Sequence, residues 1–269
     1  MRPFDHKTTL KLASKKGADI TEVRPFMEKD LALELTLAPA QGLEILTKDN
    51  RYFFKTNAIA LDDATFCIVD IECNGSKPEK HQIIEIGAVK IKNGEIVDTF
   101  ESLIACDSIS KHISELTGIT VEETLNAPSM QRVLNSFRAF IGTDIFIAHA
   151  VKFDYSFITA MYQKLGMQTM LNRSLCSIDL AERTFSSFRY GLTYLNNSLD
   201  LHQTATHHRA LSDAITTAEL FKKSLKLLPP EVKTVEELIH FSKQAKRFKR
   251  PKFDPMLNSS LETAEVLKK

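Results

Sequence analysis

The 269-residue chain contains no apolar run that approaches the roughly 18 residues needed to span a membrane. Its first residues include no apolar segment of the kind that a secretory signal requires. The four cysteines, Cys67, Cys73, Cys106 and Cys176, form no C-x-x-C pair. Neither zinc-site spacing nor a disulfide framework is therefore expected. Together these absences favour a reduced, cytoplasmic protein that contacts no membrane.

The chain also lacks a strong net charge, since 35 basic and 34 acidic residues give +1. This balance excludes a histone-like basic binder and a highly charged disordered chain. The charge is unevenly distributed: residues 1–63 are neutral overall, residues 64–228 carry −2 and residues 229–269 carry +3. Pro229-Pro230 cannot continue a preceding helix. We therefore expect an N-terminal appended unit, a central domain and a helical, basic tail, with boundaries near residues 63 and 229.

The central segment alternates between strand-like and helix-like patterns. A hairpin is predicted at Asn93-Gly94, because both residues tolerate positive φ between two apolar runs. The expected strands cover residues 66–71, 83–91, 96–104, 145–148 and 175–178. The expected helices lie near residues 127–141, 155–165, 192–199 and 209–227. This order predicts an α/β fold, in which a mixed five-stranded sheet is flanked by helices.

The N-terminal segment gives weaker signals. Asp19 and Glu22 have the spacing of a capping box. Residues 31–37 alternate like a strand but have the composition of a helix, and residues 43–46 and 52–54 could pair as a hairpin. Helices followed by a hairpin suit a small winged-helix-like unit, and a plain packing appendage is the alternative.

The most informative pattern is acidic. Asp70 and Glu72 lie at the end of a predicted strand, where side chains two residues apart project from the same face. Two carboxylates so close together are unfavourable unless a cation lies between them. Asp154 opens the helix after the strand at 145–148. His208 and Asp213 are five residues apart, so both reach one site only if His208 precedes the last helix and Asp213 lies within it.

Taken alone, each acidic signal is more often a solvated edge or a helix start. Taken together and in this order, they resemble the DEDDh family of 3′–5′ exonucleases. Residues 83–89, 92–96 and 115–120 also look like family segments, and residues 207–210 look especially like the proofreading exonuclease of bacterial replicative DNA polymerases, the epsilon type. The resemblance covers about residues 64–228 and implies a ribonuclease H-like fold.

The resemblance implies that four carboxylates hold two divalent cations, Mg²⁺ or Mn²⁺, with His208 as the general base. Hard oxygen ligands suit these ions, and a histidine can accept a proton near neutral pH. The implied metal ligands are Asp70, Glu72, Asp154 and Asp213.

Substrate contacts are also implied by the resemblance, for Ile71, Leu116, Thr117 and Phe153. Phe153 is equally well explained as a core aromatic beside a helix start. Where this chain has Ile71 and Ala150, the family commonly has Thr and Asn. Ala150 would loosen the second motif, but it removes no metal ligand.

These features predict a two-metal-ion 3′–5′ exonuclease that releases nucleotides from single-stranded or frayed DNA 3′ ends. A replicative DNA polymerase subunit is the candidate partner, with proofreading as the role. The alternatives are a 3′ exonuclease for RNA or short oligonucleotides, and a non-catalytic nucleic-acid- or polymerase-binding module. The non-catalytic alternative predicts a missing carboxylate, and none of the four is missing.

The tail includes a strongly basic stretch. Residues 242–252 contain six basic and no acidic side chains. This pattern is typical of a solvated helix end followed by a disordered tail, and the functional alternative is a contact with a phosphate backbone or a partner.

Overall fold

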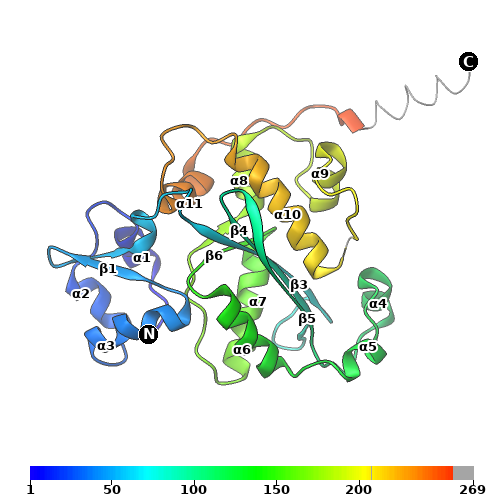
Figure 1. Ribbon diagram of the computed structural model, residues 1–269, viewed down its shortest axis with the longest axis horizontal. Helices are drawn as coiled ribbons and strands as arrows, with labels where there is room; N and C mark the ends of the chain where they lie inside the picture. The colour runs from blue at the N-terminus through cyan, green and yellow to red at the C-terminus, as the bar shows by residue number, and fades with distance from the viewer. Residues whose placement is uncertain (207, 257–269) are drawn as a thin grey trace, which may run out of the picture.

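The computed structural model describes residues 1–206 and 208–256. Its main sheet has five strands in the order β5-β4-β3-β6-β7 (Figure 1). The strands are β3 (Thr65–Cys73), β4 (Ile83–Lys92), β5 (Glu95–Leu103), β6 (Ile145–Ala148) and β7 (Ser174–Cys176). Strands β3, β4 and β5 pair antiparallel, whereas β6 and β7 run parallel to β3. The predicted mixed five-stranded sheet is confirmed, and Asn93 and Gly94 have the positive φ angles that the predicted hairpin needs.

Helices cover both faces of this sheet (Figure 1). The helices after β5 are α4 (Lys111–Thr117), α5 (Val121–Leu125), α6 (Met130–Ile141), α7 (Val151–Lys164), α8 (Ser177–Thr184), α9 (Leu192–Leu199), α10 (Ala210–Leu225) and α11 (Val235–Gln244). Successive side chains of β3 point alternately into two hydrophobic cores, one on each face of the sheet. Cys67 and Val69 pack with α6 and α7, while Phe66 and Ile68 pack with α8, α10 and α11. The same alternation shows to which face of the sheet each later side chain of β3 points.

Some boundaries differ from the sequence-based expectation. The apolar run at 175–178 ends as a strand at Cys176, and α8 begins at the next residue. The expected strand therefore extended two residues too far, because a short apolar run has the same appearance in a strand and in a buried helix. Helices α4 and α5 were not expected, because neither is long enough to show a helical period. They begin at the side-chain caps Ser110 and Thr120.

The N-terminal segment forms helices followed by a hairpin, in the expected order. These elements are α1 (His6–Leu12), α2 (Ile20–Val23), α3 (Leu31–Leu37), β1 (Ile45–Lys48) and β2 (Arg51–Phe54). Residues 31–37 are helical rather than extended, because the Asp30 carboxylate accepts from the N–H groups of Ala32 and Leu33. Leu12, Val23 and Phe54 belong to a separate core of this unit. Its winged-helix-like character stays a prediction.

Helix α11 joins the last segment to the main sheet. Val235 and Leu238 are fully buried in the same core as β3 and α10. The Glu236 carboxylate accepts from Arg173 Nε at 3.1 Å and from Thr56 Oγ1 at 2.7 Å. One carboxylate thus connects the N-terminal unit, the segment before β7 and α11; we call this contact the Glu236 joint. The proposed division at residue 229 is not a break in packing.

None of the helices in the described ranges combines the length and the apolar character that crossing a bilayer requires.

Candidate active site

The site begins at the carboxyl end of β3. Asp70 and Glu72 follow the alternation of Phe66 and Ile68, so they face α10. Asp70 is opposite Gly87 of β4. A Cβ on Gly87 would overlap the backbone of α10 at its first two residues, so only glycine allows the helix to approach the sheet this closely. The close approach delivers the start of α10 to the acidic strand end.

An ion pair with a buried carboxylate fixes the same helix start. Glu85, opposite Glu72 in the sheet, is completely buried. Its carboxylate accepts from Arg209 Nη2 at 2.7 Å and from the backbone N–H of Ala210 at 2.8 Å. No local pattern in the sequence links Glu85 to Arg209. A buried acid signals that some partner exists, but the partner is 124 residues away.

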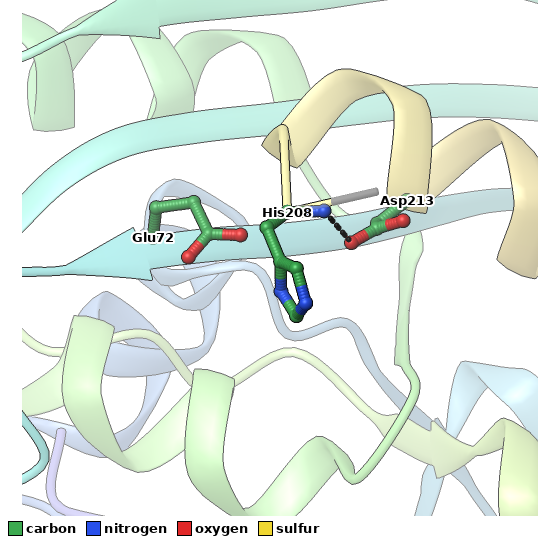
Figure 2. Close-up of side chains that lie close together, drawn as sticks. All are labelled: Glu72, His208 and Asp213. Carbon is green, nitrogen blue, oxygen red and sulfur yellow. Dashed lines mark hydrogen bonds between the residues drawn. The ribbon is translucent and has the colours of Figure 1, made fainter. Parts of the chain in front are cut away.

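His208 lies between Glu72 and Asp213 in Figure 2. Ligand atoms of these three residues all lie within 4.8 Å of one another. His208 has a φ of 61°, and its backbone N–H donates to Asp213 Oδ2 at 3.0 Å. His208 therefore stands in the loop before α10 and Asp213 inside the helix, the arrangement that the spacing requires. Its imidazole is exposed and lies near the carboxylates of Glu72 and Asp213.

Asp154 approaches from the other face of the sheet. It lies in the first turn of α7, is only 3% exposed and accepts the backbone N–H of Ile71. Among the influences that raise the pKa of Asp70, Asp154 is the strongest after burial. The four carboxylates therefore act on one another at one strand end. The side chain of Ile71 is buried, and the hydrogen bond to Asp154 uses its backbone.

Burial and mutual repulsion disfavour the ionised forms of these carboxylates when no cation is bound. Burial raises the pKa of Asp70 well above its ordinary value, and the neighbouring acids add to this. Burial, followed by the nearby Asp213, raises the pKa of Glu72 to about 8. Burial likewise raises the pKa of Asp154 to about 7. A positive charge among them would favour the ionised forms, so this oxygen-rich donor set fits hard divalent cations.

The other predicted substrate residues lie on two helices, Phe153 on α7 and Leu116 and Thr117 on α4. Phe153 precedes Asp154 and is 42% exposed, which argues against the core-aromatic alternative. Leu116 is 44% exposed and lies in the last turn of α4. Thr117 is buried, and its hydroxyl donates to the carbonyl of Ile113 at 2.9 Å. Their contacts with substrate stay predictions.

His149 holds the second motif in place. Its Nε2–H donates to the Tyr190 carbonyl at 2.8 Å, and its Nδ1 accepts from Ser177 Oγ at 2.9 Å. Burial lowers the pKa of His149 to about 4, so the ring is neutral at neutral pH. Immediately after it, Ala150 adopts a left-handed φ of 78° before α7 begins. Both ring nitrogens of His149 are hydrogen-bonded, and these contacts position the start of α7.

A cavity of about 850 Å³ lies apart from this site, between α1, the β1–β2 hairpin and α11. None of the predicted site residues lines it. The chemistry therefore centres on the strand end.

Comparisons with known proteins agree with this geometry. A family model described as Exonuclease, RNase_T, matches residues 67–221. The PolC-type DNA polymerase III of Staphylococcus aureus is 34% identical over 172 residues, which cover 63% of this chain and 12% of that protein. The chain thus spans about an eighth of the length of the curated relatives that it matches.

Solved structures share the fold. Exonuclease X in complex with 5′ overhanging duplex DNA has a TM-score of 0.54 and 24% identity, covering 66% of this chain and 99% of its own. The nuclease domain of 3′hExo, a DEDDh family member bound to rAMP, has a TM-score of 0.53 and 22% identity, covering 60% of this chain and 92% of its own. Escherichia coli exonuclease I in complex with a dA16 oligonucleotide has a TM-score of 0.55 and 14% identity, covering 62% of this chain and 42% of its own.

Proposed function

Because the chain belongs to the exonuclease family whose model spans more than half of it, we propose that it is a two-metal-ion 3′–5′ exonuclease acting on DNA 3′ ends. The observation that carries this proposal is the cluster of Glu72, His208 and Asp213, whose ligand atoms lie within 4.8 Å of one another, with the buried carboxylate of Asp154 close enough to Asp70 to raise the pKa of that carboxyl. Family membership makes the protein a nuclease and implies divalent metal ions. The polarity, the DNA substrate and the number of ions belong to the proposal.

The four converging acids would hold the cations: Asp70, Glu72, Asp154 and Asp213. When bound, a pair of divalent ions supplies charge stabilisation to the transferring phosphoryl group and to the leaving 3′ oxygen. The protein supplies a rigid frame for them. Asp70 and Glu72 are fixed by strand pairing, and Asp154 by the backbone of Ile71.

His208 is the general base of this proposal. Its imidazole lies within 4.8 Å of Glu72 and Asp213 ligand atoms yet is exposed, so an attacking water can reach it. It would take the proton from that water as the phosphodiester is attacked. Its backbone hydrogen bond to Asp213 ties the base to a metal-binding acid.

Substrate choice rests on relatives rather than on the site alone. The 34% identity to a PolC-type DNA polymerase III supports DNA and a proofreading role beside a replicative polymerase. The exposed Phe153, one residue before Asp154, offers a face on which a terminal base could stack. Both points favour a frayed or single-stranded DNA 3′ end over an internal phosphodiester.

The deciding experiment measures products from 5′-labelled DNA and RNA strands of the same sequence, with Mg²⁺ or Mn²⁺. We expect stepwise shortening from the 3′ end of DNA, faster when the terminal base is mispaired. A strong preference for RNA would replace the DNA assignment with the RNA alternative. Absence of shortening on every strand, in protein that remains folded, would overturn the proposal.

A further inference from the structure

The chain after α11 is held in an extended path along α8 and α9. We call residues 245–256 the C-terminal strap. Arg183 Nε donates to the Ala245 carbonyl at 2.8 Å, and the N–H of Phe248 donates to the Glu182 carbonyl at 2.7 Å. Near its other end, Tyr194 Oη donates to Asp254 Oδ1 at 2.6 Å. The strap is thus anchored at intervals and is not a free tail.

The two kinds of basic side chain in the strap have different roles. Arg247 pairs with Glu182 at 3.0 Å and with Asp179 at 3.2 Å, and Arg250 pairs with Glu182 at 3.0 Å. These arginines attach the strap to α8. The lysines form no ion pair within the described ranges and are exposed: they are Lys246, Lys249 and Lys252.

Aromatic side chains are interleaved with these lysines. Phe248 is 51% exposed and Phe253 is 79% exposed, although the backbone that carries them is anchored. A phenylalanine left in water forgoes the favourable burial of its ring. Alternating cations and exposed aromatic faces suit single-stranded nucleic acid, because phosphates meet the lysines while bases stack on the rings.

The strap and the start of α7 share one neighbour, Asp179 of α8. A pocket of about 470 Å³ is lined by residues 150–153 together with Ser156, Cys176 and Asp179. Asp179 is the residue that Arg247 binds, and Phe153 directly precedes Asp154. Lys152, in the same pocket, is exposed. Lys152 and Phe153, beside Asp154, therefore share a pocket with Asp179, the residue that Arg247 of the strap binds.

We propose that the C-terminal strap binds the single-stranded nucleic acid that leads to the 3′ end in the active site. The inference rests on the proposed function, because it assumes that a strand enters past Phe153. The strap lies outside the residues that match the exonuclease family model, so this surface is an addition to the family's catalytic unit. Its ligand is a polyanion with unstacked bases, which an acidic protein surface does not supply.

The first test measures binding without turnover, in EDTA, by fluorescence anisotropy of a labelled oligonucleotide of roughly 20 nucleotides. The test variant is Lys249→Ala with Lys252→Ala. The matched control is Lys223→Ala with Lys226→Ala. It removes the same charge at the C-terminal end of α10, whereas Asp213 lies in the first turn of that helix. We expect the dissociation constant of the test variant to rise about 5- to 10-fold. The plot of log association constant against log salt concentration should become less steep by about 1.4, because two phosphate contacts are lost. The control variant should keep the wild-type affinity and slope.

The second test separates the strap from the active site by substrate length. In the same variant, the KM for the long strand should rise relative to the KM for a dinucleotide, and Phe253→Ala should shift this ratio in the same direction. Equal affinity and equal salt slope in the test variant and the wild type would overturn the proposal, and would then favour a protein partner. A wild-type protein that binds the strand but shortens none would defeat the proposed function and leave the strap as a binding surface.

Discussion

Buried carboxylates of this protein lie in two opposite kinds of environment. At the Glu236 joint, a carboxylate meets Arg173 and the hydroxyl of Thr56. At the end of β3, carboxylates meet one another, and within the described ranges neither Asp70 nor Glu72 forms an ion pair. The joint is complete in the protein alone, whereas the strand end is arranged for a cation that must be added.

Backbone geometry at the strand end adds to this contrast. The strand-end site includes His208 with φ 61° and Ala150 with φ 78°, both non-glycine residues in the left-handed region. Such strain costs on the order of 1 kcal/mol at each residue and persists where function requires the geometry. Elsewhere in the described ranges the non-glycine residues with positive φ are Asp49, Asn50, Asn93 and Asp200, residue types that tolerate this conformation, so Ala150 is the least tolerant residue type among them.

Removing one strand-end charge should have the largest effect on activity. Asp70→Asn deletes a cation ligand at the centre of the four acids, so we expect exonuclease activity to fall at least about 1000-fold. The rate of shortening of a 5′-labelled strand with Mg²⁺ measures this. Asp62→Asn, at an exposed acid outside the site, is the matched control. Activity of Asp70→Asn within a few-fold of wild type would exclude the proposed metal site.

The equivalent change at the joint should lower stability instead. Glu236→Gln leaves the guanidinium of Arg173, which is 14% exposed, without its counter-charge. We expect the free energy of unfolding in urea to fall by about 3 kcal/mol, with kcat unchanged in the folded protein. Glu231→Gln, at an exposed acid of the same segment, should be neutral. A neutral Glu236→Gln would remove the contrast between the two regions.

Geometry at the strand end depends on one glycine. Gly87→Ala should push the start of α10 away from β4 and displace His208 and Asp213, because the added Cβ overlaps the helix backbone. Misplacement by about 1 Å can cost about 100-fold in rate, and we expect a kcat loss of that order. Gly191→Ala is the control, since its Cβ would meet nothing within 4 Å and its φ is −69°. Similar kcat values for both variants would contradict this role.

The repulsion among the strand-end carboxylates should make the stability of the protein depend on pH and on added cation. Without metal, the folded protein holds protons on Glu72 and Asp154 that the unfolded chain loses, because their folded pKa values are raised to about 8 and about 7. Stability should therefore fall as pH rises from about 5 to about 8 in EDTA. Adding Mn²⁺ should raise the melting temperature most at the alkaline end. Asp70→Asn should melt higher than wild type in EDTA and respond less to Mn²⁺; a pH-independent melting temperature would argue against the repulsion.

The smallest expected effect concerns backbone strain. Ala150→Gly should relieve the left-handed conformation before α7 and raise the free energy of unfolding by about 1 kcal/mol. Ala160→Gly, inside α7, should lower it by about 1 kcal/mol, because glycine is a poor residue in a helix interior. Equal signs for the two variants would show that Ala150 is not strained in solution.

Local patterns in the sequence determined much of the candidate site. Alternation along β3 put Asp70 and Glu72 on one face, and the turn at Asn93-Gly94 joined β4 to β5. The five-residue spacing put His208 before α10 and Asp213 within it. These features depend on residues close in sequence, where helix and strand periods alone decide which side chains share a face.

Only the tertiary structure decided the contacts between distant segments. Glu85 pairs with Arg209, and Gly87 makes room for α10, yet neither partnership has a local signature. The same holds for the strap, whose basic composition suggested a solvated tail until Arg247 and Arg250 were found against Glu182. Such contacts depend on how helices and strands pack, because packing brings together residues whose separation along the chain carries no information about their distance in space.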